Sequence, residues 1–223
     1  MSDAKEKLLD AALSHVPFDG WSDETFNAAI RDTGLAPGLA RGLCPRGAVD
    51  LAIAYHKRGD RQMVERLAQT DLSALRFRDR IATAVRFRLE AVEDREIVRR
   101  GMTLFALPQY GPDGARLLWE TADLIWRALG DGSDDINWYT KRATLSGVYS
   151  ATVLYWLGDD SEDHAATWDF LDRRIGDVMK FEQFKANMRA NPGLMRLLKG
   201  PLDVLGRIRA PKPHDDMPGS WRQ

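Results

Sequence analysis

Residues 134–157 read DDINWYTKRATLSGVYSATVLYWL. Large side chains in this stretch recur at intervals of three and four residues, the spacing that places them on one face of an α-helix. Gly132 interrupts the preceding pattern, and Gly158 follows the last apolar residue. The stretch therefore predicts a helix over residues 136–157, whose inner face carries Leu145, Val148, Tyr149, Thr152 and Tyr155.

The same spacing recurs on both sides of this stretch. It predicts further helices over residues 77–92, 97–107, 118–129 and 168–179, the last of them capped by Ser161. A turn is expected at residues 110–114, which include two glycines and a proline. No segment keeps the alternation of a strand, so the sequence predicts an all-α protein.

The first 60 residues contain shorter patterns. Helical spacing over residues 8–16 is followed by a helix that Ser22 caps and Gly34 ends, and Pro45 opens a longer helix with a break at Gly59. The segment between them, residues 35–42, holds Pro37 and two glycines and is expected to be a poor helix. This order is typical of a three-helix, helix-turn-helix-like head that leads into a connecting helix.

Four segments follow from these patterns. We predict a degenerate helix-turn-helix-like head over residues 1–60 and a helical ligand-binding bundle over residues 61–180. A basic amphipathic segment over residues 181–210 and a disordered, proline-containing tail over residues 211–223 complete the chain.

Composition limits the classes of function. The 223 residues carry a formal net charge of -1, so the whole chain offers no attraction for nucleic acid. The single cysteine, Cys44, cannot form an intramolecular disulfide, which fits a reducing compartment. Without a visible targeting segment or an apolar run of about 20 residues, a bacterial cytoplasm is the simplest expectation, although a mature organellar protein has the same features.

Charge within the head argues against DNA binding. Residues 1–55 hold five cations and eight carboxylates, so their balance is 5 minus 8, or -3. The segment at the position of a recognition helix, residues 35–42, has one cation, Arg41, and no Asn, Gln, Ser or Thr to pair with a base. We therefore predict a head of regulator-like architecture that does not bind nucleic acid.

No residue pattern indicates catalysis. The histidines, His15, His56, His164 and His214, form no metal-binding pair, and the acidic residues 159–163 are explained by their place before a helix. Cys44 has no base beside it in the sequence. The sequence predicts no catalytic residue, no metal and no cofactor, and favours a protein that is not an enzyme.

An aromatic and cationic cluster opens the helix over residues 136–157. Ser133 or Asp134 is positioned to cap it, and Trp138 and Arg142 stack at i, i+4 with Tyr139 beside them. Trp, Tyr and Arg are enriched at binding hot spots, so these three residues are candidates for partner binding. The alternative is that Trp138 begins the core stripe.

The C-terminal segment is strongly basic. From residue 180 to residue 212 there are eight cations and two carboxylates, and 8 minus 2 gives +6. Its apolar residues predict a helix that lies on a membrane surface, with the packing of this segment on its own bundle as the alternative. The candidate membrane residues are Phe181, Phe184, Met188, Leu194, Leu197, Leu198, Leu202 and Leu205.

The stretch Asn137 to Arg142 resembles the Coq-nine family of ubiquinone-biosynthesis proteins. The resemblance extends to Ser14-His15-Val16-Pro17 with Gly20-Trp21, and to residues 163–171 with Thr167-Trp168-Asp169-Phe170. It covers residues 5–208 and implies a TetR-like fold, a homodimer and an accessory role in which an isoprenoid quinone intermediate or a phospholipid is bound. It also implies that Trp138, Tyr139 and Arg142 dock on a di-iron hydroxylase.

A pocket between the helices is part of that expectation. From the residues alone, the aromatic side chains between residues 117 and 179 are better explained as core, whereas the resemblance implies a lipid-binding cavity. The candidate lining residues are Leu118, Trp119, Ala122, Val148, Thr152 and Leu171.

The predicted function is to bind an isoprenoid quinone precursor and present it to the hydroxylase. This would take place at the inner membrane of a bacterium, or on the matrix side of the inner membrane of a mitochondrion. The alternatives are a TetR-type ligand-responsive transcription regulator and a hydrolase or metal enzyme.

Overall fold

The computed structural model describes residues 3–189 and 209–210 of the chain, and the side chains of residues 181–189 are not described. Within the described residues there are ten α-helices, one short 3-10 helix and no strand, which confirms the all-α prediction. Five candidate membrane residues and the predicted disordered tail lie outside the described residues. These five are Leu194, Leu197, Leu198, Leu202 and Leu205.

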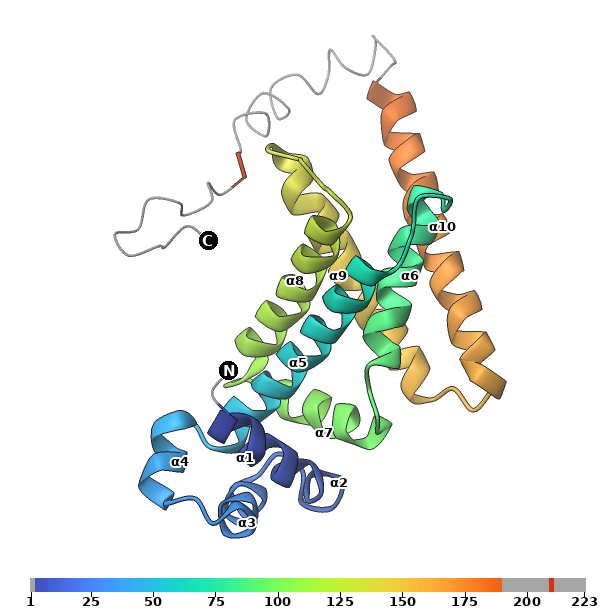
Figure 1. The fold of residues 1–223 in the computed structure, drawn as a ribbon. Helices are drawn as coiled ribbons and strands as arrows, with labels where there is room; N and C mark the ends of the chain where they lie inside the picture. The colour runs from blue at the N-terminus through green and yellow to red at the C-terminus, as the bar shows by residue number, and fades with distance from the viewer. Residues whose placement is uncertain (1–2, 190–208, 211–223) are drawn as a thin grey trace.

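The head is built from four helices and the start of a fifth. They are α1 (Asp3–Leu13), α2 (Val16–Asp19), α3 (Asp23–Thr33), α4 (Pro37–Leu43) and α5 (Ala48–Gln69). In Figure 1, α1 to α4 form the lower part of the molecule, and α5 rises from them into the bundle. Ser22 caps α3 by accepting a hydrogen bond from Thr25 N, and Gly34 ends it in the left-handed conformation, both as predicted.

The prediction of a poor helix over residues 35–42 was wrong, because this segment forms α4. Pro37 stands in the first turn, where its missing N–H costs nothing, and Ala40 is fully buried against the rest of the head. The two glycines of α4 have no neighbour within 4 Å of a Cβ position, so burial of the opposite face holds the helix. Tertiary packing thus overrides the weak local propensity.

The α5 helix begins later than predicted and does not break. Its first residue is Ala48, after Gly47 with φ 61°, because Pro45 lies in the preceding turn. At Gly59 the guanidinium of Arg88 lies so close that a Cβ would meet its Nη1 at 2.5 Å. The glycine therefore admits a buried side chain from a neighbouring helix, rather than ending its own.

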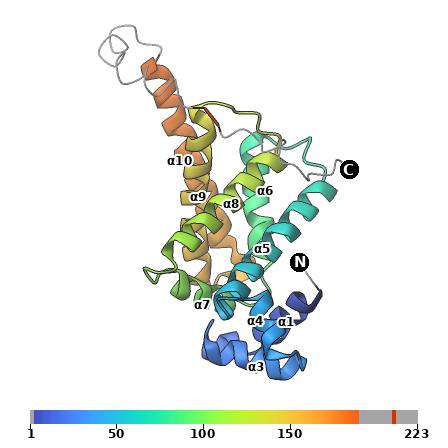
Figure 2. The same ribbon diagram turned by 90° about the vertical axis from the view of Figure 1, so that its left-hand side faces the viewer.

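Five further helices form the bundle: α6 (Phe77–Glu90), α7 (Arg95–Phe105), α8 (Gly111–Ala128), α9 (Ile136–Leu157) and α10 (Ala165–Arg189), with a 3-10 turn, η1 (Glu162–His164), before the last. In Figure 1, α5, α8 and α9 run through the middle of the bundle with α10 at one side, and in Figure 2, turned by 90°, α5 and α10 lie at opposite sides of the bundle. Their shared core includes Met63, Val85, Ile125, Tyr149, Trp156 and Leu171.

Several helix ends differ from the predictions. Asp135, not Ser133 or Asp134, caps α9 by accepting a hydrogen bond from Asn137 N. The predicted turn at residues 110–114 is largely the first turn of α8, with Pro112 in its first positions. Ser161 accepts from Ala166 N as predicted, and Asp159 accepts from Thr167 N, which confirms a capping role in this acidic segment.

The head and bundle have separate apolar cores, but α5 contributes to both. The predicted boundary after residue 60 lies inside this continuous helix. No helix among the described residues is long and apolar enough to cross a bilayer.

Candidate functional site

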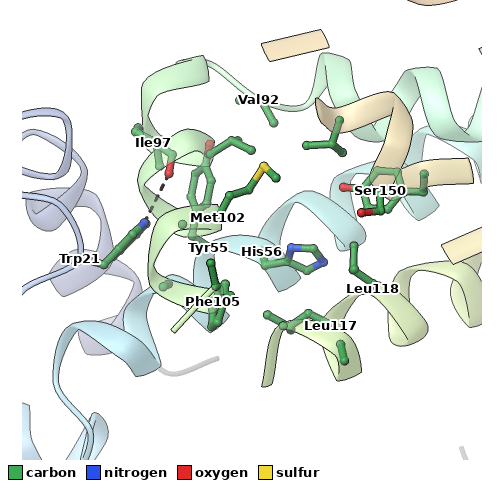
Figure 3. Close-up of a pocket in the computed structure, with 18 of the residues that line it drawn as sticks. Trp21, Tyr55, His56, Val92, Ile97, Met102, Phe105, Leu117, Leu118 and Ser150 are labelled. Atoms are coloured by element: carbon green, nitrogen blue, oxygen red, sulfur yellow. Dashed lines mark hydrogen bonds between the residues drawn. The ribbon is translucent and has the colours of Figure 1, made fainter. Parts of the chain in front are cut away.

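A cavity of about 350 Å³ lies between α5, α6, α7, α8 and α9. Figure 3 shows side chains from α5, α7, α8 and α9 converging on it. Its apolar lining includes Trp21, Val92, Ile97, Val98, Met102, Phe105, Leu117, Leu118 and Val153. The volume is at the lower end of the range for small-molecule pockets, about 300–1,000 Å³.

The α7 helix closes one side of this cavity. Ile97, Met102 and Phe105 recur on its inner face. Two contacts tie α7 to the head: Trp21 Nε1 donates to Ile97 O over 3.4 Å, and Arg100 Nη2 donates to Pro17 O over 2.9 Å. The head therefore positions the wall of a cavity in the bundle.

One part of the lining is polar. This polar wall consists of Tyr55 and His56 from α5, Arg88 from α6, and Tyr149 and Ser150 from α9. Arg88 Nε donates to Asp60 Oδ1 over 2.7 Å, and its Nη2 donates to His56 O over 3.0 Å.

The charged groups of the polar wall are compensated. Burial, followed by the charge of Arg88, lowers the pKa of His56 to about 4, so its imidazole is neutral near pH 7. His56 Nε2 lies 2.8 Å from Thr121 Oγ1, and its 3.6 Å approach to Asp60 is not an ion pair in that neutral form. Burial is also the main cause that raises the pKa of Tyr55 to about 12.

Of the six lining residues predicted from the sequence, the structure brings only Leu118 to this cavity. Ala122, Thr152 and Leu171 are buried in the core of the bundle, and Thr152 Oγ1 donates to Val148 O over 2.7 Å. A helix was predicted over residues 97–107, and the structure has it as α7, but its apolar residues were not among the predicted lining residues, although their recurrence at helical spacing was a visible signal.

Val148 lines a second, smaller pocket of about 240 Å³ between α6, α8, α9 and α10. Its other walls include Phe77, Ile81, Trp126 and Met179. Phe77 and Met179 are exposed, so apolar surface continues from this pocket to the outside of the bundle.

The sixth candidate, Trp119, lies in an aromatic patch with Trp138 and Tyr139. The ring centroids of Trp138 and Tyr139 are 4.8 Å apart, and Trp119 lies 5.8 Å from Trp138. All three residues are partly exposed, which leaves part of this aromatic patch available to a partner.

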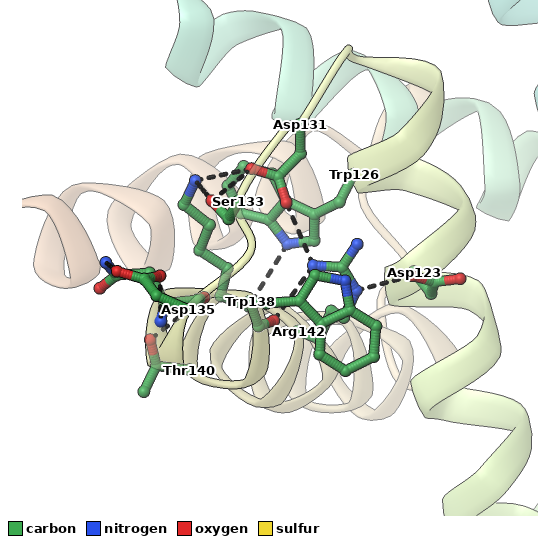
Figure 4. A network of polar contacts seen from close by, with 10 residues as sticks. Asp123, Trp126, Asp131, Ser133, Asp135, Trp138, Thr140 and Arg142 are labelled. Carbon is green, nitrogen blue, oxygen red and sulfur yellow. Dashed lines mark hydrogen bonds and ion pairs between the residues drawn. The ribbon is translucent and has the colours of Figure 1, made fainter. Parts of the chain in front are cut away.

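Arg142 does not present its charge at the surface, contrary to the sequence-based expectation of a cationic patch. Arg142 is only 1% exposed. Its Nε donates to Asp123 Oδ1 over 2.6 Å, and its Nη1 donates to Asp131 Oδ2 over 3.1 Å (Figure 4). Its Cζ lies 4.1 Å from the centroid of the Trp138 ring, so the predicted stacking is confirmed. The buried guanidinium of Arg142 thus packs against one face of the Trp138 ring.

The start of α9 has further contacts. Lys141 Nζ donates to Asp131 Oδ1 over 2.7 Å and lies 5.1 Å from the centroid of the Trp126 ring. Tyr139 Oη donates to Arg209 O over 3.3 Å, and Ala210 N donates to Asp134 O over 2.9 Å. Residues 209–210 therefore lie beside the aromatic patch.

The described part of the chain offers few side chains suited to binding a metal ion or to acting as a nucleophile. Across residues 3–189 and 209–210, no three His, Cys, Asp or Glu side chains converge as a group that could hold a metal ion. Cys44 is buried, and burial raises the pKa of its thiol, which disfavours the reactive thiolate.

Several cations in and beside the head are engaged in ion pairs. Arg46 pairs with Asp50 and Asp113, and Arg58 pairs with Glu6 and with Asp10, the latter over 2.8 Å. Cations that are held by carboxylates release fewer counterions from a phosphate backbone, so these pairs weaken any attraction for DNA.

The sequence model of the COQ9 family matches residues 111–182. The "Ubiquinone biosynthesis protein COQ9, mitochondrial" of Drosophila melanogaster is 34% identical over 183 residues, 80% of this chain and 56% of that protein. Its namesake in Rattus norvegicus is 32% identical over 78% of this chain and 58% of that protein, and the one in Homo sapiens is 29% identical over 78% and 57%. The chain thus spans somewhat more than half the length of these relatives.

Among solved structures, a TetR transcriptional regulator from Nitrosomonas europaea superposes with a TM-score of 0.65. The match covers 78% of this chain and 97% of the regulator at 18% sequence identity. At this identity the likeness shows the TetR-like fold alone.

Proposed function

The chain belongs to the COQ9 family, and from that premise we propose that it is a lipid-binding accessory protein of ubiquinone biosynthesis. In this proposal it binds an isoprenoid quinone precursor and presents the ring to a membrane-bound di-iron hydroxylase. It does no chemistry itself. The relatives are named as ubiquinone biosynthesis proteins, and the lipid and the hydroxylase are our extension of those names.

The cavity enclosed by α5, α6, α7, α8 and α9 is the observation that carries the proposal. A polyprenyl tail is held in a bilayer by the transfer free energy of its apolar surface, about 25 cal/mol per Å². A protein that exposes the ring to an enzyme must offset part of this free energy with apolar surface of its own. The lining by Val98, Met102, Phe105 and Leu118 supplies such a surface.

The aromatic patch supports the proposed docking on the hydroxylase. Trp138 and Tyr139 offer large, partly exposed rings, and the buried pairs of Arg142 hold the Trp138 ring in one orientation. A rigid aromatic anchor loses little conformational entropy on binding, which is why such residues dominate interface energetics. In this proposal Arg142 is a positioning residue, not a contact residue.

The membrane and compartment complete the proposal. The relatives are named mitochondrial, which supports a mitochondrial setting. The matrix side of the inner membrane, or the corresponding bacterial membrane, is our extension of that name. The basic segment, with a charge of +6 over residues 180–212, would bind anionic lipid headgroups, and a homodimer is part of the same expectation.

Mass spectrometry of lipids extracted from the purified protein tests the proposal. Gly101→Leu places a side chain in the cavity, because Gly101 lines it and a Cβ there meets only ordinary contacts, the nearest at 3.6 Å. Gly147→Leu is the matched control, since its Cβ would have no neighbour within 4 Å and it does not line this cavity. We expect prenylated quinone precursors from wild type and Gly147→Leu, with at least several-fold less from Gly101→Leu. Equal lipid content in all three proteins would refute the proposal.

A further inference from the structure

The α7 helix is attached to the head more firmly than to the bundle, and in Figures 1 and 2 it lies between the two. Ile97 is its one buried residue and belongs to the apolar core of the head, against which Leu104 and Phe105 also pack. Towards the core of the bundle α7 presents Val98 and Met102, which are only partly buried and line the cavity. A helix that faces a cavity lacks the packing that holds α8 and α9 in place.

Two hydrogen bonds strengthen the attachment of α7 to the head. Trp21 Nε1 donates to Ile97 O, as Figure 3 shows, and Arg100 Nη2 donates to Pro17 O. Gly101 permits this approach, because even a Cβ there would lie only 3.6 Å from Trp21 Nε1. The corner between α2 and α3 therefore holds α7 as part of the head.

On the side of the bundle, two arginines join α7 to the end of α9. Arg95 Nη1 donates to Asp159 O over 2.6 Å and to Trp156 O over 3.2 Å. Arg99 Nη2 donates to Leu157 O over 3.0 Å. Carbonyls at the C-terminal end of a helix lack helical partners, and the helix dipole favours a cation there.

These contacts between α7 and α9 are accessible to water. The side chains of Arg95 and Arg99 are 36% and 56% exposed. Water can replace an exposed hydrogen bond at a small net cost in free energy, whereas separating a packed apolar core costs much more. The polar contacts of Arg95 and Arg99 therefore break more readily than the attachment of α7 to the head.

We propose that α7 is a lid over the cavity, attached to the head and latched to the end of α9 by Arg95 and Arg99. When the latch opens, α7 moves away from the bundle with the head, and Val98 and Met102 uncover the cavity. The lid rests on the proposed function, which supplies the lipid that passes, and adds to it the route of entry. The head then supports the lid of a lipid cavity instead of binding DNA.

A cysteine inside the cavity reports opening of the lid without a ligand. Leu117 lines the cavity on α8 and is 1% exposed, so Leu117→Cys reacts with fluorescein maleimide when α7 moves away. Arg99→Met in this background removes one latch contact and should raise the labelling rate about three- to tenfold. Arg116→Met is the matched control. The side chain of Arg116 is also 56% exposed, but its ion pairs are with Asp113 and Glu120 of its own helix.

Cys44 separates opening of the lid from general unfolding. It is buried in the core of the head, which stays intact when the lid opens. Mass spectrometry of the labelled peptides should therefore show slow and equal labelling of Cys44 in all variants. A rise at residue 117 without a rise at Cys44 supports the lid. Equal rises at both positions, or no rise at residue 117, overturn it.

The binding kinetics of a lipid-like probe give an independent measurement. The probe is a benzoquinone with a two-unit isoprenoid tail, and its binding is followed by quenching of tryptophan fluorescence. The latch is closed in both the free and the loaded protein. Arg99→Met should therefore raise the association and dissociation rates by the same factor, about three- to tenfold, and leave the Kd nearly unchanged. A rise in the dissociation rate alone would mean that Arg99 stabilises the bound probe, and would overturn the lid.

The lid and the proposed function fail in different ways. Binding of the probe with unchanged rates in Arg99→Met overturns the lid and leaves the lipid cavity in place. If the probe does not bind to the wild-type chain, the proposed function is overturned, and the labelling of Leu117→Cys decides on the lid. If Leu117→Cys does not fold, the two probe rates decide.

Discussion

Replacing Arg142 with Met should destabilise the protein by an amount typical of a broken buried ion pair. The guanidinium is enclosed with Asp123 and Asp131, whose side chains are 15% and 3% exposed. Methionine fills much of the volume but leaves two carboxylates without this partner, a loss of about 3–5 kcal/mol for buried pairs. Because Lys141 still contacts Asp131 at 2.7 Å, we expect the lower end of that range.

Lys141→Met is the matched control for this change. Lys141 contacts the same Asp131, but its side chain is 37% exposed, and such pairs contribute about 0–1 kcal/mol. Urea unfolding at pH 7 measures both variants. Arg142→Met should also lower the melting temperature by about 6–12 °C, as expected for a chain of this size.

The same variants separate positioning from contact. Because Arg142 stacks under Trp138 at 4.1 Å, its loss should weaken capture of the hydroxylase by freeing that ring. If Arg142→Met were as stable as Lys141→Met and still lost the hydroxylase, Arg142 would contact the partner directly. Arg142 would then not act by holding the Trp138 ring in place.

Four other predictions have defined outcomes. Trp138→Ala or Tyr139→Ala should weaken pulldown of the hydroxylase with a nearly unchanged melting temperature, whereas a large loss of stability would place these rings in the core. Gly59→Ala should cost about 2 kcal/mol or more in urea unfolding, because its Cβ would meet Arg88 Nη1 at 2.5 Å; a stabilised variant would contradict the packing. The pKa of His56, lowered to about 4, means that the unfolded chain binds one more proton between pH 4 and 6.5. The free energy of unfolding should therefore rise with pH across that window, by up to about 3 kcal/mol, and His56→Gln should flatten the profile unless another group causes it. Mobility-shift assays at low salt should show no sub-micromolar DNA binding, and salt-sensitive binding in that range would favour the regulator alternative.

The helices were predictable where one apolar face recurs over several turns. The helix over residues 136–157 has the predicted bounds, because Leu145, Val148 and Thr152 face a buried core and Gly158 ends the pattern. Short elements were less predictable. In α4 the burial of Ala40 decides the outcome against two glycines, and no local pattern reports on that packing.

The candidate site was predictable in part. The stacking of Arg142 on Trp138 follows from their separation of four residues, but the burial of Arg142 does not. It depends on Asp123 and Asp131, which tertiary folding brings to the guanidinium from α8 and the loop after it. The cavity depends on how α7 lies across α5, α8 and α9, and helical spacing alone cannot distinguish such a wall from solid core.

The rate at which the hydroxylase converts a precursor embedded in vesicles tests the central claim most directly. Added wild-type protein and the Gly147→Leu control should both raise this rate. Gly101→Leu should still capture the hydroxylase through Trp138 and Tyr139 but should leave the rate near that of the hydroxylase alone. If Gly101→Leu stimulated the reaction as well as wild type, presentation of the lipid through this cavity would be contradicted.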